Sequence, residues 1–553
     1  MTTVKNKSNK MTKLPTLAIS ILACLASQTC LSLAEPERPN ILFIFSDDHA
    51  TDAIGAYDGR LKSVDPTPAI DKLAAQGMVM RNSFCTNSIC GPSRAAILTG
   101  KHSHKNGFMS NHNRFDWDQQ SFPKLLQKAG YQTALYGKSH LKGTPQGFDH
   151  WAVLPGQGDY FNPQFIFPDG KRVVEGYCTD VVTDMAVDFL NNNRDAQKPF
   201  LLMVQHKAPH RNWMPALRHL KLYADRDLPE PPTLFDDFKD NASPVAKHEM
   251  GIGQHMGLDY DLFQHLKNDP AQGKDQLSRF YQRMNEEQFS AYQKHYGPRN
   301  NTFLSVKSKY EANLRWKYQR YLKNYLRCVR GVDESVARLM QELETLGLAE
   351  NTIVIYSSDQ SFYLGDHGWY DKRWMYEESL QMPFIIKWPG VIKPGSSCES
   401  MIQNIDYGPT FLAAAGAAVP ADMQGLSMLP LLKGETPADW RDSIYYHYYE
   451  FPSVHMVPRQ YGIRTKRYKL IHFYQFDEWE LYDLEKDPDE LENLYGKAEY
   501  EVLTDELKKQ LAALREHYDD RTDTSAMPVE WQKNVHDPKS KFRRQANPIK
   551  VLN

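Results

Sequence analysis

Short apolar runs alternate with helix-type patterns along much of the chain, and four of these runs turn abruptly polar where they end. Continuous apolar runs of this length predict strands buried on both faces of a sheet, and their alternation with helices predicts an α/β layered fold with a mostly parallel sheet. In such sheets, ligands bind beyond the carboxyl ends of the strands. The polar residues after the four runs are therefore candidates for one site, although each could instead begin a surface loop. The runs are NILFIFSDD, YQTALYGKSH, PFLLMVQHKAPH and TIVIYSSDQ.

The pattern changes in two other parts of the chain. Residues 211–330 are polar and rich in aromatic side chains, and they predict an insertion that leads through a long amphipathic helix back into the sheet. From residue 439, shorter strand-like runs and the helical pattern EVLTDELKKQLAALREHYDD predict a smaller C-terminal subdomain with an antiparallel sheet and a helix. We therefore expect an α/β domain over residues 35–438 and an α+β subdomain over residues 439–553.

The N-terminus has the pattern of a signal peptide over residues 1–34. A lysine-rich front precedes the apolar stretch LPTLAISILACLASQTCLSLA, and Ser32 and Ala34 supply small residues for cleavage before Glu35. We therefore expect export, to the periplasm or outside the cell, with a lipoprotein anchored at Cys24 as the alternative. No later run approaches the ~20 apolar residues of a membrane span, so we expect none.

Composition and charge narrow the classes of function. Of the 553 residues, 41% are hydrophobic and 12% are aromatic, which is typical of a globular protein. The net charge of −2 provides no overall attraction to nucleic acid, so we expect no nucleic acid partner, and any recognition of an anion has to be local. Five of the seven cysteines follow the signal peptide, an odd number that leaves at least one outside an internal disulfide.

Acidic residues follow two of the predicted strands. Asp47 and Asp48 end one run, and Asp359 with Gln360 ends another. Adjacent carboxylates repel each other, and a hard divalent cation relieves that repulsion. Ligand sets made only of oxygen favour Ca²⁺ or Mg²⁺ over zinc. The Asp-Asp pair taken alone could also be a loop or helix cap.

Cationic residues gather near the same strand ends. Such a surplus of positive charge around a metal suits a tetrahedral anion such as sulfate or phosphate. Cys90 is expected just before a helix that ends at Gly100, at a helix N-terminus whose N–H groups favour anions. The alternative is a helix held by a buried Cys90, with Arg94 solvated. The cationic and histidine residues are Arg94, Lys138, His140, His210 and Lys372.

Residues 90–101, CGPSRAAILTGK, resemble the signature of the type I sulfatase family, in which C-x-P-S-R precedes an apolar run and T-G-R/K. Further clusters occur in the order typical of this family, namely NILFIFSDD, GKSH, KAPH, SDQ and GDHGWYDKRWMYEES, and the C-terminal ELYDLEKDPDELENL is also typical of it. The resemblance covers residues 39–389. It implies an alkaline-phosphatase-like fold, with a large mixed and mostly parallel sheet between layers of helices, and the hydrolysis of sulfate esters.

The resemblance also implies a chemical modification and a metal ion. Cys90 would be oxidised to formylglycine (3-oxoalanine) by a maturation enzyme, and one hydroxyl of the hydrated aldehyde would attack sulfur. Ca²⁺ would be bound by the modified Cys90 and by Asp47, Asp48, Asp359 and Gln360. Gln360 stands where relatives often have Asn or His, and its amide oxygen is still an acceptable ligand.

The family's other catalytic roles carry over to five positions of this sequence. Arg94 would support the diol and the metal side of the site. Lys138 and Lys372 would hold sulfate oxygens and neutralise the charge that grows in the transition state. His140 would act as the base on the diol, and His210 would protonate the leaving alcohol.

The expected substrate is a sulfated carbohydrate. We favour an algal polymer such as ulvan or carrageenan, with a glycosaminoglycan as the other possibility. A phosphonate monoester hydrolase or phosphodiesterase of the same superfamily, or a non-catalytic protein that binds sulfated glycans, would be the alternatives. Polar and aromatic residues near the motifs could line a sugar subsite or simply pack in the core; they are His104, Arg211, Trp213, Trp369, Arg373 and Trp374.

Overall fold

A single large sheet organises the chain, of which the structure, a computed structural model, describes residues 38–541. Ten strands lie in the order β13-β2-β12-β9-β1-β8-β4-β5-β6-β7. The five central strands, from β9 to β5, are parallel to one another, while β12 and β6 run antiparallel to them on either side. The strands are β1 (Asn40–Ser46), β2 (Met78–Met80), β4 (Gln132–Gly137), β5 (His150–Val153), β6 (Gln164–Phe167), β7 (Gly170–Val173), β8 (Phe200–Gln205), β9 (Thr352–Ser358), β12 (Phe384–Lys387) and β13 (Ser396–Cys398).

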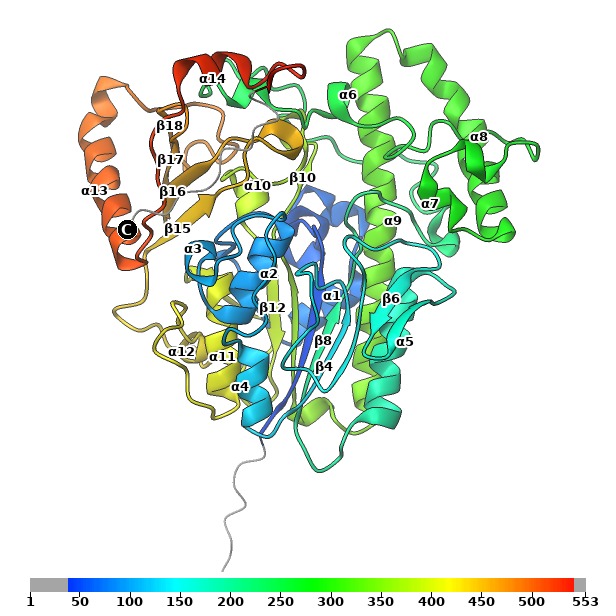
Figure 1. The fold of residues 1–553 in the computed structure, drawn as a ribbon, viewed down its shortest axis with the longest axis vertical. Helices are drawn as coiled ribbons and strands as arrows, with labels where there is room; N and C mark the ends of the chain where they lie inside the picture. Colours follow the sequence, from blue (N-terminus) through cyan, green and yellow to red (C-terminus); the bar gives the residue numbers. More distant parts are fainter. Residues whose placement is uncertain (1–37, 542–553) are drawn as a thin grey trace, which may run out of the picture. The chain divides into compact units, whose positions relative to one another are not determined.

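Helices cover both faces of this sheet (Figure 1). Side chains alternate along β1, so Leu42 and Ile44 enter one hydrophobic core while Ile41, Phe43 and Phe45 enter the other. Both cores exclude water, which explains why the strand sequence is apolar throughout. The predicted α/β fold with a mostly parallel sheet is confirmed. The covering helices are α1 (Pro68–Ala75), α5 (Cys178–Asp188) and α9 (Tyr310–Thr345) on one face, and α2 (Cys90–Thr99), α4 (Phe122–Lys128) and α11 (Tyr407–Ala414) on the other.

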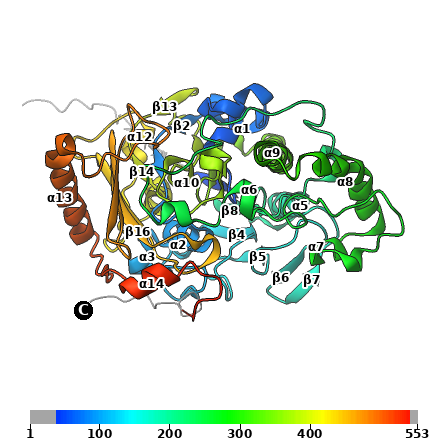
Figure 2. The ribbon, with the colours of Figure 1, turned by 90° about the horizontal axis from the view of Figure 1, so that it is seen from above.

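The long segment between β8 and β9 contains two prominent helices. Helix α8 (Glu286–Val306) begins at a capping box in which the Asn285 side chain accepts from Gln288 N–H. Helix α9 follows it, packs against α5 and leads into β9. Figures 1 and 2 show α9 between α8 and the rest of the molecule. The amphipathic helix that the sequence predicts before the sheet resumes is therefore α9.

A second sheet lies near the C-terminus. Its four antiparallel strands follow one another in chain order, and helix α13 (Glu501–His517) packs against them. This confirms the predicted combination of an antiparallel sheet and a helix. The predicted signal peptide and Cys24 lie outside the described residues. The strands are β15 (Ser443–Tyr448), β16 (Gln460–Thr465), β17 (Tyr468–Phe473) and β18 (Glu478–Asp483).

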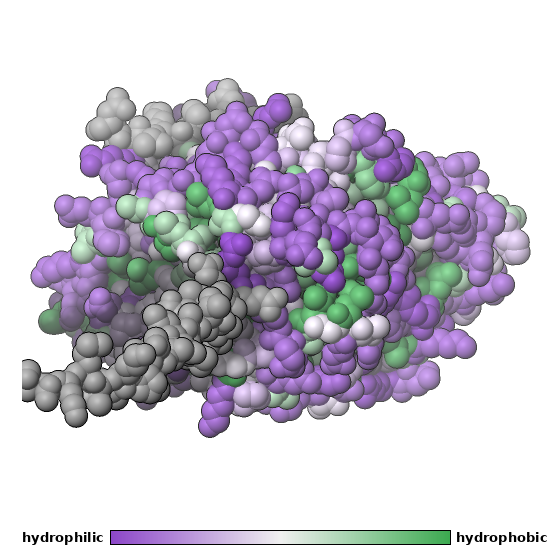
Figure 3. All heavy atoms as spheres, turned by 90° about the horizontal axis from the view of Figure 1, so that it is seen from below, coloured by the Kyte–Doolittle hydropathy of each residue, from purple (hydrophilic) through white to green (hydrophobic). Residues whose placement is uncertain are grey.

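Polar residues dominate the face of the molecule that is opposite to the carboxyl ends of the central strands. Figure 3 shows apolar side chains there only in small, separate groups. Within residues 38–541, none of the helices is both long and apolar enough to cross a membrane. The five cysteines in this part of the chain are all free thiols, and Cys398 alone among them is not buried.

Candidate active site

The carboxyl ends of four central strands bring several of the predicted site residues to one edge of the sheet. Asp47 and Asp48 directly follow β1, and Asp359 and Gln360 directly follow its neighbour β9. Lys138 directly follows β4, and the loop after β8 carries His210. Because β4, β8, β1 and β9 are adjacent and parallel, their ends lie side by side. The alternative of four unrelated surface loops is therefore wrong.

Three buried carboxylates form the centre of the site. Asp47, Asp48 and Asp359 are each 0% exposed, and one oxygen of each lies within 4.8 Å of the others. Burial raises the pKa of Asp48 to about 8, even though Lys372 opposes the shift. The Asp359 carboxyl also has a raised pKa because it is buried and close to Asp47. Carboxylates held together in this way need cations nearby to stay charged.

Two lysines and an arginine supply those cations. Lys138 pairs with Asp47, and Lys372 Nζ lies 2.6 Å and 2.7 Å from the two carboxylate oxygens of Asp48. Arg94 Nε lies 3.0 Å from Asp359 Oδ2, and its Nη2 lies 3.3 Å from Asp47 Oδ2. The three positive charges balance the three carboxylates. A divalent cation bound to the acids would leave both lysines free to hold an anion.

The donor set of the acid cluster fits a hard divalent cation. Three carboxylates and the Gln360 amide provide only oxygen ligands of the kind that Ca²⁺ and Mg²⁺ prefer. The Gln360 amide nitrogen donates to Asp48, and its Oε1 is buried without a hydrogen-bond partner. A cation would give this orphaned oxygen a partner. Asp47, Asp48, Asp359 and Gln360 are therefore the residues that would hold the ion.

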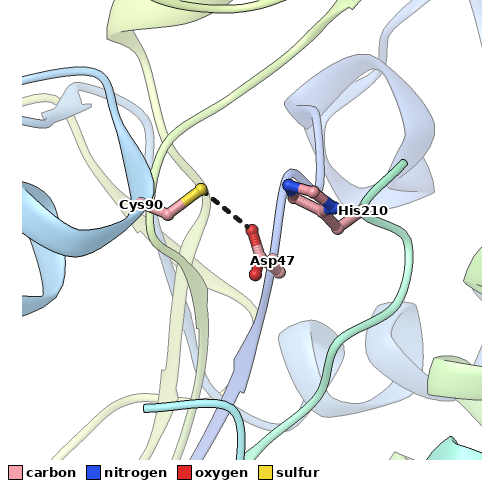
Figure 4. A group of neighbouring side chains, drawn as sticks. All are labelled: Asp47, Cys90 and His210. Carbon is pink, nitrogen blue, oxygen red and sulfur yellow. Dashed lines mark hydrogen bonds between the residues drawn. The ribbon is translucent and has the colours of Figure 1, made fainter. Parts of the chain in front are cut away.

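Cys90 faces the acid cluster from the first turn of α2. Helix α2 begins at Cys90 itself, so the cysteine belongs to the helix and does not precede it as the sequence suggested; the helix ends at Gly100, where φ is +65°. Cys90 Sγ donates to Asp47 Oδ1 at 3.4 Å (Figure 4). Burial, with Asp47 nearby, raises the pKa of the Cys90 thiol, so these surroundings disfavour a thiolate. An unmodified cysteine is poorly suited to act as a nucleophile here.

Two histidines reach the same site from different loops. Figure 4 shows His210 on the opposite side of Asp47 from Cys90, and His210 Nε2 lies 3.7 Å from Asp48 Oδ2. His210 Nδ1 donates to Arg211 O at 2.5 Å, which leaves Nε2 as the nitrogen that can exchange a proton. His140 Nδ1 is buried without a hydrogen-bond partner. Burial, with Lys138 nearby, lowers the pKa of both histidines.

The predicted sugar contacts divide into two groups. Arg211 and Arg373 adjoin His210 and Lys372 in the chain, and each pairs with a carboxylate: Arg211 Nε lies 2.6 Å from Asp261 Oδ1, and Arg373 Nε lies 3.2 Å from Asp371 Oδ1. Both guanidiniums are thus fixed beside the site. They remain predicted substrate contacts.

The other predicted sugar contacts belong to packed interiors. Trp213 is fully buried, with its ring 4.4 Å from that of Tyr321. His104 Nε2 donates to Tyr518 O at 2.8 Å, which ties α3 (Ser103–Asn106) to the C-terminal part of the chain. Neither residue presents a surface to a sugar, so packing is the better explanation of both. The same holds for Trp369 and Trp374, which stack on each other and are 0% exposed.

Two supporting residues were not found from the sequence. The Gln157 amide oxygen accepts from Lys138 Nζ, and the Tyr325 hydroxyl donates to Asp48 O at 2.7 Å. Gln157 follows the end of β5 by four residues, so its place after a parallel strand was a usable signal. Tyr325 lies in the middle of α9, where the sequence gives no signal of a functional site, because only the packing of α9 on the sheet brings Tyr325 to Asp48.

The fold and the site together fit an enzyme that acts on an anionic substrate, and comparisons with known proteins specify its class. The sulfatase family model matches residues 39–417, and a C-terminal model of N-sulphoglucosamine sulphohydrolase matches residues 365–517. The chain belongs to the sulfatase family. It is a sulfatase that acts on sulfated carbohydrate.

Individual known proteins are similar to this chain to different degrees. An N-acetylglucosamine-6-O-sulfatase of Bacteroides thetaiotaomicron is 47% identical over 93% of this chain and 92% of its own length. An ulvan-active sulfatase of Formosa agariphila is 26% identical over 91% and 87% of the two chains. A solved structure in complex with its substrate D-glucosamine-2-N,6-O-disulfate is 47% identical, covers 88% of this chain and 99% of its own, and has a TM-score of 0.84. A phosphonate monoester hydrolase from Silicibacter pomeroyi, at 20% identity and a TM-score of 0.66, shares the fold.

Proposed function

We propose that this sulfatase removes the 6-O-sulfate of N-acetylglucosamine or a related glucosamine. The observation that carries this proposal is the 47% identity, over almost the whole of both chains, to an N-acetylglucosamine-6-O-sulfatase. The ulvan-active relatives, at 26% and 27%, are far more distant. The proposal replaces the preference for an algal polymer. The signal-type N-terminus adds the proposal that the protein is exported.

The nucleophile would be formylglycine made from Cys90. Once hydrated, it would supply a hydroxyl oxygen that attacks sulfur and displaces the sugar alcohol. Its second hydroxyl would then lose a proton, so that sulfate leaves as the aldehyde forms again. The raised pKa of the unmodified thiol supports this proposal, because a buried, protonated thiol is a weak nucleophile. Ca²⁺, held by the acid cluster, would polarise oxygen atoms of the reacting groups as a Lewis acid.

Lysine and histidine side chains of the chain would then hold the sulfate group and transfer protons. Lys138 and Lys372 would hold sulfate oxygens, because both ammonium groups already lie at the acid cluster and carry charge that an anion can balance. His210 would donate the proton at Nε2 to the oxygen of the leaving sugar. Its Nδ1 stays bonded to Arg211 O, which fixes the ring. The negative charge of a bound sulfate ester would raise the pKa of His210 and so favour its protonated form.

His140 would serve as the base in the second half of the reaction. It would accept the proton of the second hydroxyl as the bond between carbon and the sulfate oxygen breaks. Burial and Lys138 lower its pKa, so the ring is neutral and able to accept a proton. Arg373, fixed by Asp371 and by a 3.3 Å contact to the Tyr448 hydroxyl, would donate to sugar hydroxyls.

A panel of position isomers tests the proposed substrate. Sulfate release is measured with matured enzyme on glucosamine derivatives that carry a single sulfate at O6, at O3 or on nitrogen. We expect kcat/KM for the 6-O-sulfate to exceed the others by at least 100-fold, which corresponds to roughly 3 kcal/mol of transition-state binding. Comparable rates on all three isomers would contradict the assignment. Peptide mass analysis around Cys90 separately shows whether the aldehyde is present.

A further inference from the structure

A cavity of about 490 Å³ lies between helices α8 and α9, and none of the proposed active-site residues lines it. Figure 2 shows these two helices side by side, with α8 far from α2. Trp316, Arg320, Lys323 and Arg327 are spaced by four, three and four residues, which places them on one face of α9. The α8 helix contributes His295, Arg299 and Thr302 to the opposite wall.

Positive charge in this cavity exceeds negative charge. Five lysine and arginine residues line it, against two acidic residues. Asp227 is 89% exposed and lies 3.6 Å from Lys323, while Glu230 lies 3.1 Å from Arg315. Within residues 38–541, the other three cations have no carboxylate partner within ion-pair distance; they are Arg299, Arg320 and Arg327.

Two of these unpaired arginines are deeply buried and are held by neutral groups. Arg320 is 9% exposed, and its Nη1 donates at 2.9 Å both to Leu262 O and to Asn300 Oδ1. Arg327 is 3% exposed, and its Nε donates to Leu222 O at 2.9 Å. These bonds fix both guanidiniums without neutralising them. The Nη2 group of Arg320 makes no hydrogen bond within the described residues and remains able to donate, while Arg327 also interacts with the Tyr296 side chain.

The cavity also holds an unpartnered polar atom. His295 is 7% exposed, and its Nε2 is buried without a hydrogen-bond partner. Burial and the neighbouring Arg327 and Arg299 lower the pKa of His295 to about 3, so the ring is neutral. Burial lowers the pKa of Arg320 to about 10, and Arg327 and Arg299 add to the shift. An anion in the cavity would relieve the repulsion among these cations and give His295 a partner.

We propose that this cavity is a second anion-binding site, which takes a sulfate group of a sulfated saccharide on Arg299, Arg320 and Arg327. Arginine forks suit a tetrahedral oxyanion because two of their N–H groups can bind two of its oxygens at once. The volume exceeds what a single oxyanion fills, so part of a sugar ring can enter with the sulfate group. Trp316 lies in the lining, with the Arg320 guanidinium 4.8 Å from its ring centroid. The inference goes beyond the proposed function, since the cavity shares no residue with the proposed active site.

Calorimetric titration of the full chain carrying Cys90→Ser, which prevents turnover, tests the proposal. The cavity variant is Arg299→Gln with Lys323→Gln, because Arg299 is exposed and Lys323 partly so, and neither supports the core. The matched control is Lys294→Gln with Arg338→Gln, which removes two charges from the same two helices outside the cavity. One arm uses sodium sulfate, and the other uses a sulfated tetrasaccharide of glucosamine and uronate.

Sodium sulfate is expected to bind the parent and the control at two sites per chain, the active site and the cavity. The cavity variant should bind sulfate at one site only, or bind it at the cavity at least tenfold more weakly. The tetrasaccharide should likewise bind the cavity variant at least fivefold more weakly than the control. Equal binding by the cavity and control variants in both arms would overturn the proposal. An effect on inorganic sulfate alone would overturn its saccharide part. Sulfate release from N-acetylglucosamine-6-sulfate, measured separately, shows whether the proposed function fails independently of the cavity.

Discussion

Arg94 joins two of the three buried carboxylates of the proposed active site, so its replacement tests how that site is held together. Arg94→Met keeps an apolar side chain of similar length and removes the guanidinium. The change breaks the 3.0 Å contact to Asp359 and the 3.3 Å contact to Asp47. It also removes a donor to Lys138 O and a 3.2 Å hydrogen bond to Gln205 Oε1.

The expected loss of stability follows from burial. Arg94 is 2% exposed and both carboxylates are fully buried; Asp47 keeps Lys138 in the variant, but the buried Asp359 carboxylate loses its ion pair. Removal of one member of a buried ion pair typically costs ~3–5 kcal/mol. The control, Arg338→Met, breaks an ion pair with Asp184 in which both side chains are about half exposed. A pair of that kind contributes ~0–1 kcal/mol.

Urea unfolding in the presence of a chelator measures both variants without a contribution from bound metal. We expect Arg94→Met to lose ~3–5 kcal/mol of unfolding free energy, and Arg338→Met to stay within ~1 kcal/mol of the parent. Asp359→Asn in the Arg94→Met background should restore part of the loss, because it removes one unpaired charge. A cost below ~1 kcal/mol for Arg94→Met would refute the view that Arg94 balances the acid cluster.

Three further outcomes follow from the same structure. Cys90→Ser should abolish sulfate release in a host that modifies only cysteine; substantial residual turnover would contradict the assignment of the nucleophile. Burial alone lowers the pKa of His367, but the hydrogen bond to Asp236 and nearby carboxylates raise it to about 9, above its ordinary value of 6.5. Charged His367 therefore contributes roughly 3 kcal/mol to the free energy of unfolding below pH 6.5, and this contribution is lost as the pH rises through 9. The free energy of unfolding of His367→Asn, measured with a chemical denaturant, should fall less steeply over this pH range than that of the parent. Trp213→Ala should cost ~3–5 kcal/mol in a thermal or urea unfolding assay, because the ring is fully buried; a loss under ~1 kcal/mol would show that the ring is not part of the core.

The strands and the acid cluster could be predicted because both are local properties of the sequence. Each of the four central strands that carry the site has an apolar middle, and polar residues of the site follow within a few positions of its end. Once the sheet is taken as parallel, Asp47 after β1 and Asp359 after β9 must lie at the same edge. No knowledge of side-chain packing is needed for that step.

Residues whose position depends on packing between distant elements were missed or misjudged. Trp213 lies in a polar segment three residues after His210, and nothing in that segment shows that Tyr321 on α9 covers its ring. Tyr325 reaches Asp48, and Arg299 and Arg327 line the same cavity, because α9 packs against the sheet on one side and against α8 on the other. The register between two helices is a tertiary property, so neither contact could be read from the amino-acid sequence.

The most direct test of the central proposal is a competition in one reaction between N-acetylglucosamine-6-sulfate and a sulfated ulvan oligosaccharide, with matured enzyme and Ca²⁺. The two desulfated products are quantified over the first few per cent of conversion, so their ratio gives the ratio of kcat/KM values. We predict that the glucosamine product forms at least 100-fold faster. Preferential release of sulfate from the ulvan oligosaccharide would contradict it.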